Sequence, residues 1–210
     1  MADKKSNEFE TEQENFWAGK FGDDYLERNI DEPISYNLNL FSSILSKTYK
    51  VNSVIEFGSN IGLNLVAIRH LLPESSLSAV EINDNAVNYL HKIKYLDEVH
   101  HTSILKFKPK KKYDLCLTKV ALIHIEPEKL IDVYDLLYDC TNKYIVICEY
   151  YSPNPVQIKY RGYERKLFKR DFAGDMLDRY PDLFLLDYGF AYHRDNHFPQ
   201  DDLNWFILSK

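Results

Sequence analysis

Apolar side chains in the first fifty residues recur at helical spacing. Within residues 16–30, Trp17, Phe21 and Tyr25 follow one another at intervals of four residues and therefore fall on one helix face. Residues 34–48 carry a second apolar stripe of the same period. The pattern predicts two amphipathic helices in this part of the chain.

From residue 51 onward, short apolar runs alternate with segments of helical spacing. The predicted strands cover residues 53–57, 77–81, 99–103, 112–119, 143–150, 184–192 and 204–209. The predicted helices cover residues 64–72, 84–93, 127–140 and 171–180, with Asp84 as the N-cap of the second. This alternation predicts an α/β fold with a mostly parallel sheet, and the last two strands, which no helix separates, predict an antiparallel pair.

The chain is predicted to form one domain over residues 16–210. Residues 1–15 are polar, and we expect them to be disordered or to fray from the following helix. Residues 16–50 form the predicted helical cap. Proline and glycine interrupt the pattern within residues 150–170, which predicts an insertion on the substrate side of the domain.

The charge balance excludes broad nucleic-acid binding, because 26 basic and 32 acidic side chains give a net charge of −6. The three cysteines are widely spaced in apolar segments and are predicted to be reduced core residues. The N-terminal segment lacks the apolar core of a signal peptide, and no apolar run approaches the length of about 18 residues that a membrane span needs. We therefore expect a cytoplasmic protein.

A glycine-containing turn follows the first predicted strand in the segment EFGSNIG. Gly58 and Gly62 permit a tight turn and close approach of a ligand to the backbone, and Asn60 tolerates a left-handed conformation. Glu81 ends the second predicted strand, where an acidic side chain can accept hydrogen bonds from ribose hydroxyls. The two features together predict a nucleoside-binding site.

A dinucleotide-binding oxidoreductase is the first alternative, but its G-x-G-x-x-G pattern is incomplete here, because Asn60 and Leu63 stand where glycines are expected. The bulk of Asn60 would crowd a pyrophosphate more than a ligand that has no phosphate. A cofactor-binding protein without catalysis is the second alternative.

The strand–EFGSNIG–helix–strand–EIN arrangement resembles the class I S-adenosylmethionine-dependent methyltransferases, whose first motif is E/D-x-G-x-G-x-G. Several further segments are similar to the pseudaminic acid biosynthesis-associated methylases: FWAGKFGDDYLERN, LTKVALIHIEP, EYYSPNPVQIKYRG and KLFKRDFAGDML. This resemblance spans about residues 16–208. It implies a small-molecule acceptor from bacterial surface-glycan biosynthesis, such as a sugar or nucleotide sugar for a capsule or flagellar nonulosonate.

The resemblance implies a Rossmann-like, seven-stranded sheet of order 3-2-1-4-5-7-6, with only strand seven antiparallel and helices on both faces. It also implies S-adenosyl-L-methionine as the cofactor. The predicted cofactor-binding residues in the body of the domain are Gly58, Ser59, Asn60, Gly62, Glu81, Ile82, Ser103 and Ile104.

The helical cap is expected to cover the cofactor. Trp17 and Tyr25 are predicted to line its pocket, and Arg28 is predicted to pair with the methionine carboxylate. In the alternative interpretation, this segment is a structural helix that packs on the sheet.

The predicted catalytic residues follow the fourth strand, since ligands of open α/β sheets bind beyond the carboxyl ends of the strands. His124 is the candidate general base, because histidine can remove a proton near neutral pH. The alternative is a buried histidine whose ring is satisfied by a backbone carbonyl. Lys119, at the tip of that strand, is predicted to orient an anionic acceptor or simply to cover the sheet edge.

The predicted acceptor site follows the fifth strand, where a basic segment begins. Basic side chains suit a carboxylate, phosphate or nucleotide-sugar acceptor, although a run of charges is also typical of a solvated face. The predicted substrate-binding residues are Tyr150, Tyr151, Asn154 and Arg161. No metal site is expected, since His193 and His197 fall in a predicted loop and not on a helix.

Overall fold

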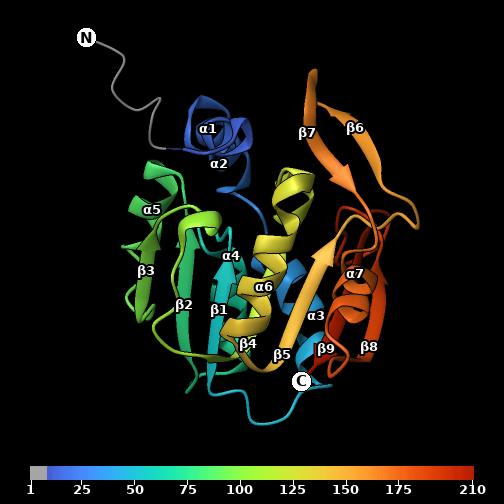
Figure 1. Cartoon of the computed structure of the whole chain (residues 1–210). Helices are drawn as coiled ribbons and strands as arrows, with labels where there is room; N and C mark the ends of the chain where they lie inside the picture. Colours follow the sequence, from blue (N-terminus) through green and yellow to red (C-terminus); the bar gives the residue numbers. More distant parts are fainter. Residues whose placement is uncertain (1–8) are drawn as a thin grey trace.

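The computed structural model describes residues 9–210 and contains a central seven-stranded sheet (Figure 1). The strand order is β3-β2-β1-β4-β5-β9-β8. The strands are β1 (Ser53–Phe57), β2 (Ser76–Glu81), β3 (Glu98–His101), β4 (Tyr113–Lys119), β5 (Thr141–Glu149), β8 (Phe184–Ala191) and β9 (Leu203–Ser209). Pairings from β3 to β5 are parallel, and β9 is antiparallel to both of its neighbours. The predicted α/β fold with a mostly parallel sheet is confirmed.

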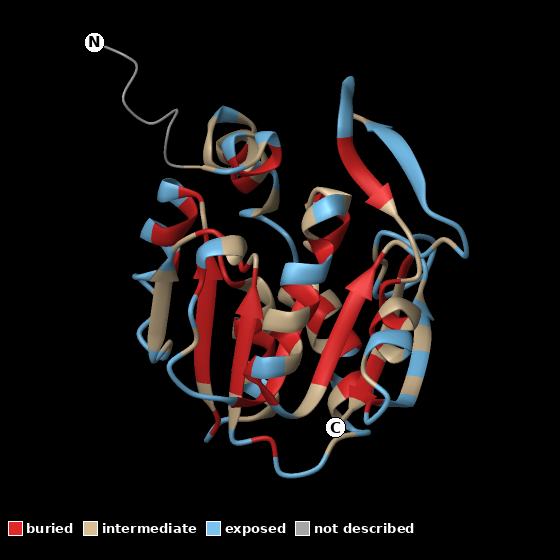
Figure 2. Cartoon of the chain, viewed as in Figure 1, coloured by how far each residue is buried: buried red, intermediate tan, exposed pale blue. Residues whose placement is uncertain are grey.

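Helices cover both faces of this sheet. They are α3 (Ile34–Leu45), α4 (Leu63–Leu71), α5 (Asp84–Leu90), α6 (Leu130–Cys140) and α7 (Phe172–Arg179). In β1, Val54 packs into the cluster that contains α3 and α4, whereas Ile55 packs into the cluster that contains α6 and α7. Successive residues of a strand point to opposite faces, so strands covered on both faces need the near-continuous apolar runs seen in the sequence. Figure 2 shows these central strands as buried.

The observed order 3-2-1-4-5-9-8 differs in its strand numbers from the predicted 3-2-1-4-5-7-6, because the chain forms two additional strands between β5 and β8 that lie outside this sheet. β6 (Val156–Tyr160) and β7 (Tyr163–Lys169) pair with each other as a separate antiparallel hairpin. Arg161 and Gly162 form its tip with positive φ angles of 48° and 91°. Figure 1 shows this hairpin rising beside the carboxyl ends of the parallel strands. Residues 150–170, predicted as an insertion on the substrate side, thus contain an antiparallel hairpin.

The N-terminal segment forms two short helices where the sequence predicted one. α1 (Glu12–Ala18) and α2 (Lys20–Asn29) are separated at Gly19. The predicted aromatic face still forms, since the rings of Phe21 and Tyr25 each lie 5.3 Å from that of Trp17. α1 begins inside the segment predicted to be disordered, where Thr11 and Glu14 form a reciprocal capping box. Residues 1–8 of that segment lie outside the described residues.

Two smaller expectations are settled by the structure. Asn83 and not Asp84 caps α5, because the Asn83 side chain accepts a hydrogen bond from the backbone N–H of Ala86 at 2.9 Å. The cysteines are free and buried, as predicted: Cys116, Cys140 and Cys148. Among the described residues, none of the helices combines the length and apolar character needed to cross a membrane.

Candidate functional site

A cavity of 410 Å³ lies at the carboxyl ends of the parallel strands. Its lining includes Gly58, Ile82, Thr102 and Val120, which directly follow β1, β2, β3 and β4. Predicted site residues that line it are Trp17, Tyr25, Gly58, Ser59, Asn60, Glu81, Ile82, Ser103, Ile104, Lys119 and His124. The volume falls in the range of about 300–1,000 Å³ that is typical of small-molecule sites.

The turn after β1 forms one wall of this cavity. Gly58, Asn60 and Gly62 have φ angles of 75°, 46° and 82°, a region that glycine and, more rarely, asparagine adopt. The backbone N–H groups of Gly58 and Ser59 both donate to the carbonyl oxygen of Val80, at 2.9 and 3.1 Å. The turn is thereby held against the end of β2, and Gly62 begins α4 behind it.

Glu81 connects this turn to the end of β2. Its Oε2 accepts a hydrogen bond from the backbone N–H of Asn60 at 2.7 Å, and its Oε1 accepts from those of Ile82 and Asn83, both at 2.8 Å. Burial raises the pKa of Glu81, whereas these backbone donors lower it. Since a carboxylate offers about four lone-pair positions, Oε2 retains capacity for a ligand hydroxyl.

The segment after β3 supplies the neighbouring part of the wall. The Ser103 hydroxyl oxygen accepts from the backbone N–H of Leu105 at 3.1 Å and begins the short helix η1 (Ile104–Lys106). Ser103 is buried, and its O–H remains a possible donor toward a ligand. Ile82 and Ile104 add apolar surface on the same side of the cavity.

A buried carboxylate that the sequence analysis did not single out fixes the loop after β4. Glu149 ends β5, and its Oε1 accepts from the backbone N–H groups of Ala121 and Leu122 at 3.0 and 2.9 Å. Burial raises the pKa of Glu149 to about 7. This contact holds the short helix η2 (Leu122–His124) over the sheet and so places His124 at the cavity.

His124 is buried at the cavity, and one of its ring nitrogens contacts a backbone carbonyl. Its Nδ1 lies 2.6 Å from the carbonyl oxygen of Lys166, whereas its Nε2 is buried and has no partner among the described residues. Burial lowers the pKa of His124 to about 4. The ring is therefore neutral near pH 7, and its centroid lies 4.4 Å from that of Trp17.

Lys119 lies at the tip of β4, as predicted, and lines the cavity. Its Nζ donates to the Oδ1 of Asn37 on α3 at 3.3 Å. Burial lowers the pKa of Lys119, and the nearby carboxyl of Glu56 opposes that shift. Lys119 is the one lysine or arginine among the described residues that line the cavity.

Glu56 is an acidic residue of the first motif that no prediction assigned to the site. It is fully buried in β1, and its Oε1 accepts from Nδ2 of Asn64 at 2.5 Å. Burial raises the pKa of Glu56 to about 8. Within the described part of the chain, Glu56 Oε2 and Asn64 Oδ1 have no hydrogen-bond partner. Asn64 lines the cavity, so part of this polar pair lies at the cavity wall.

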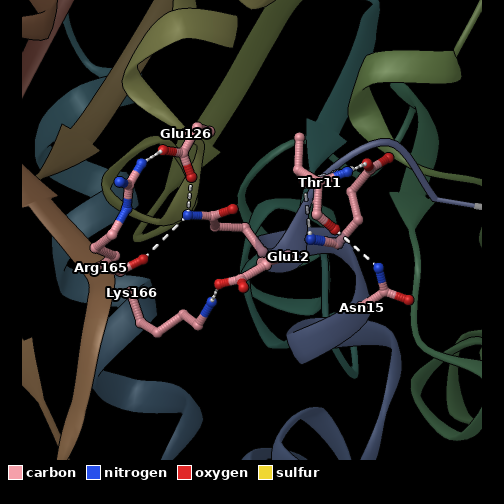
Figure 3. Close-up of polar contacts among 8 residues, drawn as sticks. Thr11, Glu12, Asn15, Glu126, Arg165 and Lys166 are labelled. Carbon is pink, nitrogen blue, oxygen red and sulfur yellow. Dashed lines mark hydrogen bonds and ion pairs between the residues drawn. The ribbon is translucent and has the colours of Figure 1, made fainter.

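Helix α1 lines the cavity, and polar contacts attach it to the β6–β7 hairpin (Figure 3). Lys166 Nζ lies 3.0 Å from Oε2 of Glu12. The Nε2 of Gln13 donates to Glu126 and, at 3.0 Å, to the carbonyl oxygen of Arg165, whose guanidinium also pairs with Glu126. Two basic residues of the hairpin therefore hold the cap in place.

Six predicted residues do not line the cavity. Gly62 is buried behind the turn. Arg28 is exposed and lies over the rings of Phe21 and Tyr25. The four predicted substrate-binding residues also lie outside its lining: Tyr150, Tyr151, Asn154 and Arg161. The last three of these are exposed, and their predicted role is supported by no contact with the cavity.

Several lining residues were missed by the sequence analysis: Gln13, Glu14, Asn29, Glu32, Tyr36, Asn37, Asn64, Glu126, His193, Gln200 and Asp201. Thr11 and Glu14 carry the spacing of a capping box, a signal that indicates where α1 begins. The others come from segments that are far apart in the sequence, and only the fold brings them together.

Solved methyltransferases share this architecture. The plantazolicin methyltransferase BpumL in complex with SAH matches with a TM-score of 0.66 at 18% identity, over 94% of this chain and 93% of that one. A SAM-dependent methyltransferase from Leishmania major matches with a TM-score of 0.70 at 12% identity, over 94% of this chain and 80% of that one. Magnesium protoporphyrin IX methyltransferase from Synechocystis with bound SAM matches with a TM-score of 0.65 at 10% identity, over 96% of this chain and 98% of that one. At such identities the likeness establishes the fold alone. No protein-family model and no curated protein matches the chain.

Proposed function

We propose that this protein is an S-adenosylmethionine-dependent methyltransferase that acts on a small-molecule acceptor. One observation carries the proposal: Glu81 accepts the backbone N–H of Asn60 at the wall of a cavity, which joins the glycine turn to the acidic end of β2. The fold around this pair is shared with methyltransferases solved with SAM or SAH.

The cavity residues fit the adenosine part of this cofactor. Glu81 Oε2 keeps acceptor capacity for a ribose hydroxyl. Ile82 and Ile104 offer apolar surface for an adenine ring, and the Ser103 hydroxyl offers a donor for one of its ring nitrogens. The turn at Gly58–Gly62 has no phosphate to accommodate, which agrees with Asn60 at its centre.

The amino-acid part of the cofactor is assigned to the end of the cavity that Lys119 and Asn64 line. Lys119 is the lining cation available for the carboxylate, with Asn37 holding its ammonium group. The unpartnered Oδ1 of Asn64 supports recognition of an ammonium group nearby. This assignment replaces Arg28, which lies outside the cavity lining.

S-Adenosylmethionine, when bound, supplies a methyl group on a positively charged sulfur that is already activated for transfer. The protein must then position the acceptor and exclude water, and positioning alone can lower a barrier by about 7–11 kcal/mol. Trp17 and His124 both line the cavity, and their ring centroids lie 4.4 Å apart. His124 presents a lone pair at Nε2, and its lowered pKa favours hydrogen bonding over proton uptake at neutral pH.

A sugar-related or anionic acceptor from surface-glycan biosynthesis is supported by the sequence resemblance alone. The basic side chains that suggested an anionic acceptor belong largely to the β6–β7 hairpin, where the side chain of Lys166 pairs with Glu12 of α1 and that of Arg165 pairs with Glu126. The roles of Tyr150, Tyr151, Asn154 and Arg161 in acceptor binding remain predictions.

Incubation with S-adenosylmethionine and separate panels of hydroxyl, carboxylate and amine acceptors tests this function. Mass spectrometry would follow the release of S-adenosylhomocysteine and a mass increase of one methyl group in the acceptor. Turnover with any panel supports the proposal. Cofactor binding without turnover across all panels would favour the non-catalytic alternative, and selective NAD binding would favour the oxidoreductase.

A further inference from the structure

Four buried polar atoms in the part of the cavity lining that α1 and the loop after β4 form, here called the roof, have no hydrogen-bond partner among the described residues. They are Gln13 Oε1, Glu14 Oε1, Trp17 Nε1 and His124 Nε2. All four residues line the cavity, three from α1 and one from the loop after β4. Since buried polar groups in folded proteins are almost always hydrogen-bonded, these atoms indicate the chemistry of a missing ligand.

The surrounding hydrogen bonds decide which of these atoms donate and which accept. Both Nε2 contacts of Gln13, with Glu126 and with the Arg165 carbonyl, require a donor, so its free atom is the acceptor Oε1. The carbonyl of Lys166 can only accept, so His124 carries its proton on Nδ1 and leaves Nε2 as an acceptor.

Glu14 and Trp17 complete the set. Oε2 of Glu14 already accepts from the backbone N–H groups of Glu10 and Thr11, both at 2.8 Å, which leaves Oε1 free. The indole of Trp17 can only donate. The subsite therefore presents three acceptors and one donor. Gln13, Glu14 and His124 are each less than one-tenth exposed.

We propose that this subsite, formed by Gln13, Glu14, Trp17 and His124, binds an amine on the acceptor molecule. A neutral primary amine offers two N–H donors and one lone pair, and an ammonium group offers three donors. A hydroxyl has one donor and leaves acceptors unpaired, and a carboxylate has none. The inference rests on the proposed function, because it assigns the subsite to the acceptor of that reaction.

The charge of the cavity supports the same class of ligand. Carboxyl side chains in its lining come from Glu14, Glu32, Glu81, Glu126 and Asp201. Lys119 is the single lysine or arginine among the described lining residues, and it lies at the end assigned to the cofactor. An anionic acceptor would face net repulsion, whereas an amine would be attracted. The rings of Trp17, Tyr25 and His124 add an aromatic wall beside the polar atoms.

Benzylamine, benzyl alcohol and benzoate form a matched set of probes that share the ring and differ in the polar group. Each would be titrated with and without saturating S-adenosylhomocysteine, while NMR follows the indole N–H signal of Trp17. The chain contains two tryptophans, and Trp205→Phe identifies the signal of Trp17. The expected result is saturable movement of this signal by benzylamine, with at least tenfold weaker binding of benzyl alcohol and none of benzoate.

Glu14→Gln places a donor where the free Oε1 acceptor stands, while keeping an oxygen for the capping box. It is expected to weaken benzylamine binding at least tenfold and to reduce its preference over benzyl alcohol. Glu128→Gln makes the same charge change at an exposed residue outside the lining. It should leave the affinity for benzylamine and the preference over benzyl alcohol unchanged.

Equal or tighter binding of benzoate, an unchanged preference in folded Glu14→Gln, or no effect of any probe on Trp17 would overturn the amine subsite. The S-adenosylhomocysteine titration is separate. If S-adenosylhomocysteine did not bind, the proposed function would be contradicted. The probe titrations without S-adenosylhomocysteine would still decide whether the subsite binds an amine.

Discussion

The Nδ1 atom of His124 lies 2.6 Å from the carbonyl oxygen of Lys166, and this contact joins the loop after β4 to β7. It fixes the tautomer of the imidazole and directs the Nε2 lone pair away from the hairpin. The same hydrogen bond therefore has a structural role and determines what the ring can offer to a ligand.

His124→Ala is expected to lower both stability and turnover. Loss of the ring leaves the Lys166 carbonyl without its partner, which costs about 1–3 kcal/mol of the free energy of unfolding. Turnover should fall about tenfold or more, because the Nε2 acceptor that is proposed to contact the acceptor molecule is lost. Melting temperature, cofactor affinity and turnover would be measured together, with the exposed His91→Ala as control. Near wild-type turnover of the folded variant would exclude a catalytic role.

Gly58→Ala is expected to be more damaging than Gly162→Ala. Both glycines have positive φ angles, 75° and 91°, so both substitutions introduce backbone strain of about 1–2 kcal/mol. A Cβ at Gly58 would also lie 3.0 Å from that of Ala121, whereas a Cβ at Gly162 meets nothing within 4 Å. Gly58→Val should be worse than Gly58→Ala. Denaturant unfolding and cofactor titration measure the difference, and equal effects at the two glycines would contradict this account of the turn.

Glu56 makes stability depend on pH with a defined sign. Its pKa is about 8 in the folded protein, above the ordinary value of 4.5, so the folded state holds an extra proton between these values. Relative to Glu56→Gln, the free energy of unfolding of the wild type should fall with rising pH across this window. The expected slope is about 1.4 kcal/mol per pH unit where the proton difference is complete. If the free energies of unfolding of the wild type and Glu56→Gln changed in parallel from pH 5 to 8, Glu56 would not be buried in this way.

Glu81→Gln is expected to weaken cofactor binding with a smaller loss of stability than Glu81→Ala. Alanine leaves three backbone N–H groups without their acceptor, whereas glutamine keeps one oxygen for them. The lost charge-assisted hydrogen bond to ribose is worth about 1.5–3 kcal/mol, roughly tenfold or more in affinity. The exposed Glu74→Gln serves as control. Wild-type affinity in both Glu81 variants would remove the ribose assignment.

The parallel part of the sheet and the turn at Gly58 could be predicted from the sequence, because each depends on neighbouring residues. Buried strands need continuous apolar runs, and a left-handed turn needs glycine or asparagine. The hairpin β6–β7 was missed because its strands are largely exposed and Pro153 and Pro155 precede it.

The roof of the cavity could not be predicted in the same way. Gln13 and His124 belong to segments that are far apart in the sequence, and neither carries a pattern that identifies its partner. Their free atoms are defined only by the hydrogen bonds that Arg165 and Lys166 make with them. The structural role of Glu149 likewise depends on a tertiary contact with the loop after β4.

Calorimetric titration of S-adenosylhomocysteine and, separately, of NAD into the wild-type protein tests the central claim most directly. The cavity at Gly58 and Glu81 is predicted to bind S-adenosylhomocysteine at one site with micromolar affinity and to give no heat with NAD. Gly58→Val should weaken or abolish that binding. A clear response to NAD with none to S-adenosylhomocysteine would contradict the assignment of this protein as a methyltransferase.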